Sequence, residues 1–135
     1  MESRDPRERD LSAFLRAGAG ATFVWGEIDC SLFMADWCRK TRGVDPAASL
    51  RGRYRTALGA MRHVRRLGGF EAMARKLMAG CGFATTDAPR PGDVGLVEHP
   101  VVGPVFAVRC RIGWAVKSPE GIAVDQYPTV VAWSV

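Results

Sequence analysis

The sequence predicts an α+β protein in which N-terminal helices pack on a C-terminal antiparallel β-sheet. Up to residue 80, apolar residues recur every three or four positions, which is the spacing of one helix face. After Cys81, prolines punctuate the chain and β-branched residues gather in short runs, which is typical of strands joined by turns. Helices first and strands afterwards indicate an α+β layer rather than alternating βαβ units.

The N-terminal stretch predicts a lead segment followed by a single domain. Asp10 is expected to cap a short helix that ends in the glycine-rich stretch 17–20. Residues 1–10 mix acids and bases and are expected to be frayed or ordered by a partner. We therefore divide the chain into a lead segment with a short helix, 1–20, and one domain, 21–135.

Three further helices are expected before residue 81. The first of them covers 30–42, because Asp29 is a favoured N-cap residue and Gly43 is a favoured stop. The other two cover 56–67 and 70–80, where apolar residues repeat with helical spacing and glycines break the pattern.

The second half of the chain predicts five short strands. They are expected at 93–97, 105–112, 114–117, 121–124 and 129–135. Each run is rich in β-branched residues and is bounded by turn residues. The sequence Pro119-Glu120-Gly121 predicts a hairpin turn between the third and fourth strands.

The composition indicates a globular protein, with 47% hydrophobic and 24% charged residues. No apolar run approaches the roughly 20 residues that a helix needs to cross a bilayer, so no membrane partner is expected. The N-terminus has no apolar core of a secretory signal, so export by the general route is not expected either.

Cys30 is the most informative residue because it directly follows the capping Asp29. As the first residue of its helix, it would lie where free N–H groups and the positive end of the helix dipole favour a thiolate. The same N–H groups could stabilise an oxyanion, so the position is that of a candidate nucleophile. The neighbouring carboxylate works against this role by raising the thiol pKa. A buried structural cysteine is the alternative.

The four cysteines include no C-x-x-C pair, and their spacing matches no zinc or ferredoxin pattern. Reduced thiols and no cofactor are therefore expected. A metal or iron-sulfur site built from all four cysteines is kept as an alternative.

The net charge of +5 is concentrated in an arginine run between positions 51 and 66. Arg51, Arg53 and Arg62 are its candidate binding residues for an anionic partner, either nucleic acid, an acidic protein or a wall polymer. Nucleic acid is the least favoured of these, because Tyr54 is the one aromatic residue in the run. A solvated helix face is the ordinary alternative.

Two motifs in this order resemble the NlpC family of papain-like cysteine peptidases. They are the aromatic-Gly segment that leads into Asp29-Cys30-Ser31, and Pro91-Gly92-Asp93-Val94 at the start of a strand. The likeness covers most of the chain, from Phe23 onward. It implies a nucleophile helix lying across a small antiparallel sheet, and cleavage of amide bonds in peptidoglycan stems.

The resemblance also implies roles for single residues. Cys30 takes the nucleophile position, Trp25 walls the cleft, and Asp29 and Ser31 shape the entrance of the helix. The family's base is a histidine that begins the strand after the Gly-Asp strand, but here that stretch reads Pro-Val-Phe at 104–106.

Only two histidines are available to replace the missing base. His99, near the end of the Gly-Asp strand, is the candidate, provided that the loop 100–104 folds back toward the thiol. His63 lies in the arginine-rich helix and is expected at the surface. Without an imidazole, no group is evident that would form the thiolate or protonate the leaving amine.

The strand-rich end resembles a particular branch of the family. The stretch 112–122 and the closing Ala-Trp-Ser-Val are similar to small NlpC-like proteins encoded among the tail genes of siphophages and gene transfer agents. This implies a place in the virion tail, at the distal tail hub, with other tail-tip or hub proteins and peptidoglycan as partners. Two forms of this hypothesis stand, an active endopeptidase and a noncatalytic structural plug or adaptor, and the missing histidine favours the second.

Overall fold

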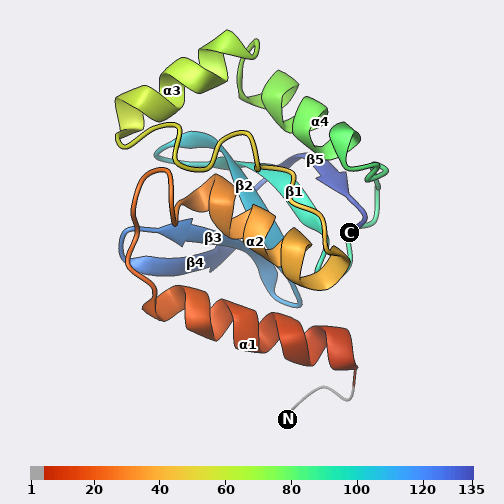
Figure 1. The fold of residues 1–135 in the computed structure, drawn as a ribbon. Helices are drawn as coiled ribbons and strands as arrows, with labels where there is room; N and C mark the ends of the chain where they lie inside the picture. Colours follow the sequence, from red (N-terminus) through yellow and green to blue (C-terminus); the bar gives the residue numbers. More distant parts are fainter. Residues whose placement is uncertain (1–4) are drawn as a thin grey trace.

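The computed structural model describes residues 5–135, which form four helices and one five-stranded antiparallel sheet (Figure 1). The helices are α1 (Pro6–Gly20), α2 (Cys30–Arg42), α3 (Ala57–Arg66) and α4 (Phe70–Gly80). The strands are β1 (Val94–His99), β2 (Gly103–Cys110), β3 (Gly113–Ser118), β4 (Gly121–Asp125) and β5 (Thr129–Trp133). The predicted α+β class is confirmed.

The caps of α2 lie where the sequence predicts them. The Asp29 side chain accepts hydrogen bonds from the second and third amides of the helix, and Gly43 ends it in the left-handed conformation with φ 72°. Thr56 caps α3 in the same way, by accepting from the Gly59 amide. These boundaries follow from local side-chain chemistry, so they could be predicted from the sequence.

The prediction for the first helix is wrong at its start. α1 begins at Pro6 with Asp5 as its cap, so Asp10 lies inside the helix. A capping aspartate followed by a first-turn proline is the stronger start signal, and the prediction overlooked it. The expected fraying of 1–10 is therefore wrong for the helical residues from Pro6 onward, and its part on 1–4 lies outside the described residues.

The strands follow one another in the order β4-β3-β2-β1-β5, and every neighbouring pair is antiparallel. The five predicted strands are thus present, with ends shifted by a few residues. The outer edge of β5 is covered by the chain before β1, since the Thr86 amide donates to the Ala132 carbonyl and the Ser134 amide to the Ala84 carbonyl, both at 2.9 Å.

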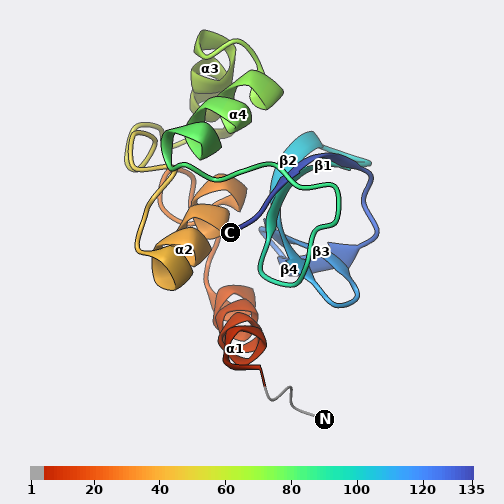
Figure 2. The same ribbon diagram turned by 90° about the vertical axis from the view of Figure 1, so that its right-hand side faces the viewer.

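Helix α2 lies on one face of the sheet and forms the centre of the main core. Figure 2 shows α2 and α4 on the same side of the sheet, with α1 below them and packed against β4 and β3. Trp37 of α2 is fully buried with Phe106 and Trp133 of the sheet. Its indole N–H donates to the Gly92 carbonyl at 2.7 Å, which ties α2 to the chain just before β1.

The Gly-Asp motif at the start of β1 has a structural role. The Asp93 carboxylate is buried and accepts from the Arg90 amide at 2.8 Å and from the Val135 amide at 3.1 Å. It also forms an ion pair with Arg7 of α1 at 3.3 Å. A Cβ atom at Gly92 would lie 2.4 Å from the Arg7 side chain, so only glycine lets that arginine lie there. The motif therefore joins β1, the C-terminal residues and α1.

Candidate functional site

A cleft of about 1080 Å³ opens between the α3–α4 pair and the ends of β1, β2 and β3, and Cys30 lies on its wall. The cleft brings together most of the site residues predicted from the sequence, namely Trp25, Asp29, Cys30, Ser31 and His99, and adds His63. Arg51, Arg53 and Arg62 do not line it.

Asp29 is buried, and four hydrogen bonds saturate its carboxylate. One oxygen, Oδ1, accepts from the amides of Ser31 at 3.1 Å and Leu32 at 3.0 Å. The other, Oδ2, accepts from the Gly26 amide at 3.0 Å and from the Tyr54 hydroxyl at 2.7 Å. The carboxylate therefore fixes the chain on both sides of Cys30, and its charge stays next to the thiol.

The helix start offers little to an oxyanion, which corrects the expectation from the sequence. The amides of Ser31 and Leu32 are bonded to Asp29, and the Phe33 amide donates to the Asp29 carbonyl at 2.8 Å. Among the described residues of this turn, the Cys30 amide is the one N–H group that is not bonded to Asp29, and together with the Ser31 amide it acts on the Cys30 sulfur and lowers the thiol pKa. A single donor is a weak oxyanion site compared with a converging pair.

The Cys30 thiol is not activated. Desolvation by burial and the Asp29 charge raise its pKa to about 11, and the Ser31 hydroxyl opposes this only in part. At pH 7 this pKa leaves on the order of one thiolate in 10,000. The side chain packs on an apolar cluster of sheet residues that includes Val105 of β2 and Trp114 and Val116 of β3. These surroundings suit a thiol and disfavour a thiolate.

His99 belongs to the cleft wall, but its ring is used by its own loop. Nδ1 accepts from the amides of Val101 at 3.1 Å and Val102 at 3.4 Å, and the ring packs on Tyr127 at 5.3 Å between centroids. A ring whose Nδ1 accepts hydrogen bonds carries its proton on Nε2, so its basic lone pair is already used. No hydrogen bond between an imidazole and Cys30 is found in residues 5–135.

The resemblance implies a histidine at the start of β2, but the residues there are apolar. Pro104 and Val105, at the start of β2, line the cleft. The second histidine, His63, lies on α3, and its Nε2 is 3.2 Å from the Arg53 carbonyl. The chain thus places a cysteine at the start of a helix beside a sheet, but among the described residues no base that would deprotonate its thiol is bonded to it.

One candidate of the arginine run is paired within the chain, and the other two are exposed. Arg51 bonds Asp36 and Asp45 of the same chain, each at 2.7 Å, so its charge is neutralised internally. Arg53 and Arg62 are exposed. Sequence reasoning could not foresee the two aspartates, because they meet Arg51 only through the fold.

The four cysteines do not converge. Cys30 lies in the cleft, whereas Cys110 lines a different pocket. Cys38 is a buried residue of α2, and burial, followed by the neighbouring Cys81, raises its pKa to about 12. Among residues 5–135 no group of three or more histidine, cysteine or acidic side chains is placed to hold a metal ion. The four-cysteine alternative is therefore not supported by the geometry.

Comparison with known families gives one match. A family model described as a domain of unknown function, DUF6950, matches residues 3–135. The chain belongs to the DUF6950 family. No curated protein and no solved structure matches it significantly. The site of this DUF6950 member must therefore be understood from its own residues.

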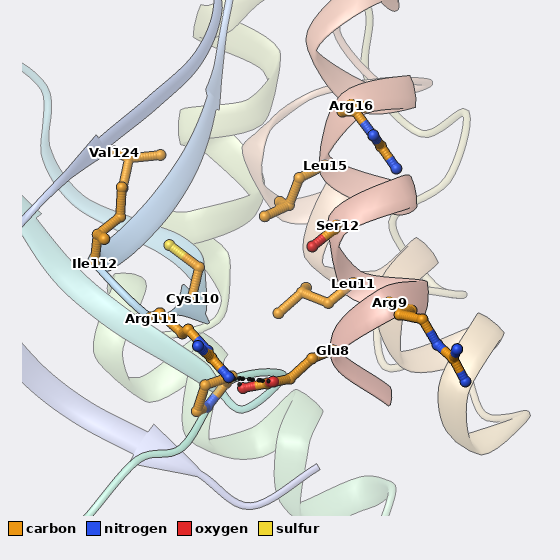
Figure 3. Close-up of a pocket in the computed structure, with 11 residues that line it drawn as sticks. Glu8, Arg9, Leu11, Ser12, Leu15, Arg16, Cys110, Arg111, Ile112 and Val124 are labelled. Carbon is orange, nitrogen blue, oxygen red and sulfur yellow. Dashed lines mark hydrogen bonds and ion pairs between the residues drawn. The ribbon is translucent and has the colours of Figure 1, made fainter. Parts of the chain in front are cut away.

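A second pocket of about 570 Å³ lies between α1 and the β2–β3 turn (Figure 3). Its apolar wall includes Leu11 and Ile112, and the Glu8–Arg111 ion pair at 2.9 Å closes one end. In Figure 3 Arg9 and Arg16 point away from this pocket. The charged side chains that Figure 3 labels around this pocket are thus either paired with each other or directed away from it. No helix among the described residues is long and apolar enough to cross a membrane.

Sequence reasoning missed two residues of the DUF6950 cleft. Tyr54 is the one aromatic residue that the arginine run offers as a stacking surface, but it is buried and its hydroxyl donates to Asp29. Burial, followed by this hydrogen bond, raises the pKa of Tyr54. Lys117 of β3 is only 2% exposed, and its ammonium donates to the Ala21 carbonyl at 2.6 Å. A lysine within a β-branched strand pattern gave a hint of an unusual buried cation, but not of its partner.

Proposed function

We propose that this DUF6950 chain is a noncatalytic tail-tip protein on an NlpC-like fold, a structural plug or adaptor of the distal tail hub. The resemblance supplies the location and the ancestry. A cysteine at the start of a helix that crosses an antiparallel sheet, and a Gly-Asp turn into β1, support the ancestry.

The loss of catalysis depends on one observation, the environment of the Cys30 sulfur. Its pKa is raised to about 11, and it packs on apolar side chains. A thiol hydrolase needs a base to form the thiolate and an acid to protonate the leaving amine, and removing such a group typically costs 10²–10⁴-fold in rate. Among the described residues neither imidazole is hydrogen-bonded to Cys30: the Nδ1 atom of His99 accepts from the Val101 amide, and the Nε2 atom of His63 lies 3.2 Å from the Arg53 carbonyl. The cleft therefore serves to hold a partner.

Digestion of purified peptidoglycan tests the noncatalytic assignment. We expect the wild-type chain and Cys30→Ser to release equal amounts of soluble stem peptides, both at the level of a buffer control, as measured by liquid chromatography. Release by the wild type that disappears in Cys30→Ser would show an active endopeptidase and overturn the assignment.

The tail location is tested separately. Mass spectrometry of purified phage or gene-transfer-agent particles should find the chain in the tail fraction, at a copy number far below that of the tail-tube protein. Its recovery only from the cell lysate, with particles that lack it, would contradict the location.

Nucleic-acid binding is not part of the proposal. Arg51 is neutralised by Asp36 and Asp45, and the ring of Tyr54 is buried against the site. Charge-driven binding to DNA depends steeply on salt, so binding that weakened by orders of magnitude between low and physiological salt would revive that alternative.

A further inference from the structure

The cleft continues into an exposed apolar rim. Val101 and Val102, in the β1–β2 turn, are 84% and 63% exposed, and Met61 of α3 is 51% exposed. All three line the cleft. Apolar side chains that border a cavity and stay open to water mark binding surfaces more often than isolated exposed residues do.

The same cleft has a buried cation without a carboxylate partner. Lys117 lines the cleft and is almost fully buried, and among residues 5–135 its ammonium bonds only the Ala21 carbonyl, at 2.6 Å. An ammonium group has three N–H donors, and a buried charge is costly unless it is paired. The Ala21 carbonyl accounts for one of the three donors and leaves two without a partner among the described residues.

The other charged residues of the cleft do not pair with Lys117. Arg65 lines it, together with the two histidines. Of the two acidic residues on the wall, Asp29 is saturated by four donors and Glu120 lies in the β3–β4 turn. Arg65 and Lys117 are matched in number by Asp29 and Glu120, so the wall is mainly apolar and has no net charge, and neither acidic residue is hydrogen-bonded to Lys117.

We propose that the cleft is the docking site for an apolar segment of a partner protein, and that a carboxylate of this segment pairs with Lys117. A partner protein fits better than a small molecule, because the cleft is already as large as the largest common ligand pockets, roughly 300–1,000 Å³, and its apolar rim extends the surface further. The carboxylate belongs to an aspartate or glutamate side chain or to a chain terminus.

This inference rests on the proposed function in one respect only, that the cleft holds a partner rather than a substrate. The noncatalytic assignment and the docking site are tested by different experiments. Wall digestion by the wild type would overturn the noncatalytic assignment and leave the binding result standing, whereas absence of peptide binding would overturn the docking site alone.

Selection from a displayed library of random 12-residue peptides tests the docking site. We expect the wild-type chain to enrich peptides that combine apolar residues with an acidic residue or a free C-terminal carboxylate. Fluorescence anisotropy then gives the dissociation constant of each synthetic peptide and of its Glu→Gln, Asp→Asn or C-terminally amidated form. Neutralising the carboxylate should weaken binding about tenfold, because one charge-assisted pair contributes about 1.5 kcal/mol or more.

Protein variants connect this loss to the cleft. Lys117→Met should weaken binding by about the same factor and remove the difference between the charged and neutral peptides, which is the signature of a direct pair. Val102→Asp should weaken binding at least tenfold. Ile112→Asp is the matched control, since this residue is 72% exposed in the β2–β3 turn, away from the cleft, and it should change nothing.

Three results would overturn the docking site. They are no enrichment relative to selection on Val102→Asp, enriched peptides without a carboxylate, and a neutral peptide that binds the wild type as tightly as the charged one. The last comparison needs no protein variant. It therefore tests the docking site even if circular dichroism shows that Lys117→Met does not fold.

Discussion

Replacing Asp29 by asparagine tests how much the site depends on one buried carboxylate. Asparagine is also a good N-cap residue, so its carbonyl can still accept from the amides of Ser31 and Leu32. Its amide group, however, would meet the Gly26 N–H and the Tyr54 O–H, two donors that now bond the carboxylate. The substitution therefore keeps the cap and removes half of the network.

The expected loss of stability can be worked from these contacts. The Tyr54 hydroxyl can rotate and accept a hydrogen bond from the new amide, but the buried Gly26 N–H cannot adapt. An unsatisfied buried donor costs about 1–3 kcal/mol, and replacing charged acceptors by neutral ones costs about 1 kcal/mol more. We expect Asp29→Asn to lower the free energy of unfolding by about 2–4 kcal/mol.

The same substitution should also change the pKa of the Cys30 thiol. The Asp29 charge is the second cause of the raised Cys30 pKa, after burial. Its removal should lower the pKa below about 11, but not below the ordinary 9.0, because burial remains.

Urea unfolding followed by tryptophan fluorescence measures the stability change, and Asp87→Asn, at an exposed aspartate, is the control. Surface substitutions typically change the free energy of unfolding by up to about 0.5 kcal/mol. If Asp29→Asn lowers it by no more than this relative to the control, the carboxylate network does not stabilise the fold as we infer.

Three further predictions concern the surroundings of the site. Arg51→Gln should cost about 1 kcal/mol in urea unfolding, because it breaks two partly buried ion pairs; no change would mean that the arginine is free. Gly26→Ala should yield little folded protein by circular dichroism, since a Cβ atom there would meet the Tyr54 carbonyl and Gly26 has a φ of 81°; normal yield would contradict the turn. The raised Cys30 pKa contributes stability that is fully present below pH 9 and lost as pH rises through about 11. Cys30→Ser should therefore lose less stability than the wild type over this window, and parallel curves would contradict the raised pKa.

Local signals explain which parts of the fold could be predicted from the sequence. The bounds of α2 follow from Asp29 and Gly43, each of which acts within one turn of its own position. The strands follow from runs of β-branched residues between turn residues. The start of α1 also has a local signal, a capping Asp5 followed by Pro6. The prediction chose a second aspartate, Asp10, as the cap instead.

The character of the site could be predicted only in part. The missing histidine was visible in the sequence, but the state of the thiol was not. It depends on Val105 and Val116, which reach Cys30 through the sheet. The partner of Tyr54 and the burial of Lys117 likewise depend on residues far away in the chain.

In the proposed function Cys30 is a half-buried, protonated thiol and not a nucleophile. The most direct measurement is the rate of Cys30 alkylation by iodoacetamide from pH 6 to 11.5, resolved from the other cysteines by peptide mass spectrometry. The account predicts a rate that rises about tenfold per pH unit and levels off only near pH 11. A rate that reaches its plateau below pH 8 would show an activated thiolate and contradict the claim.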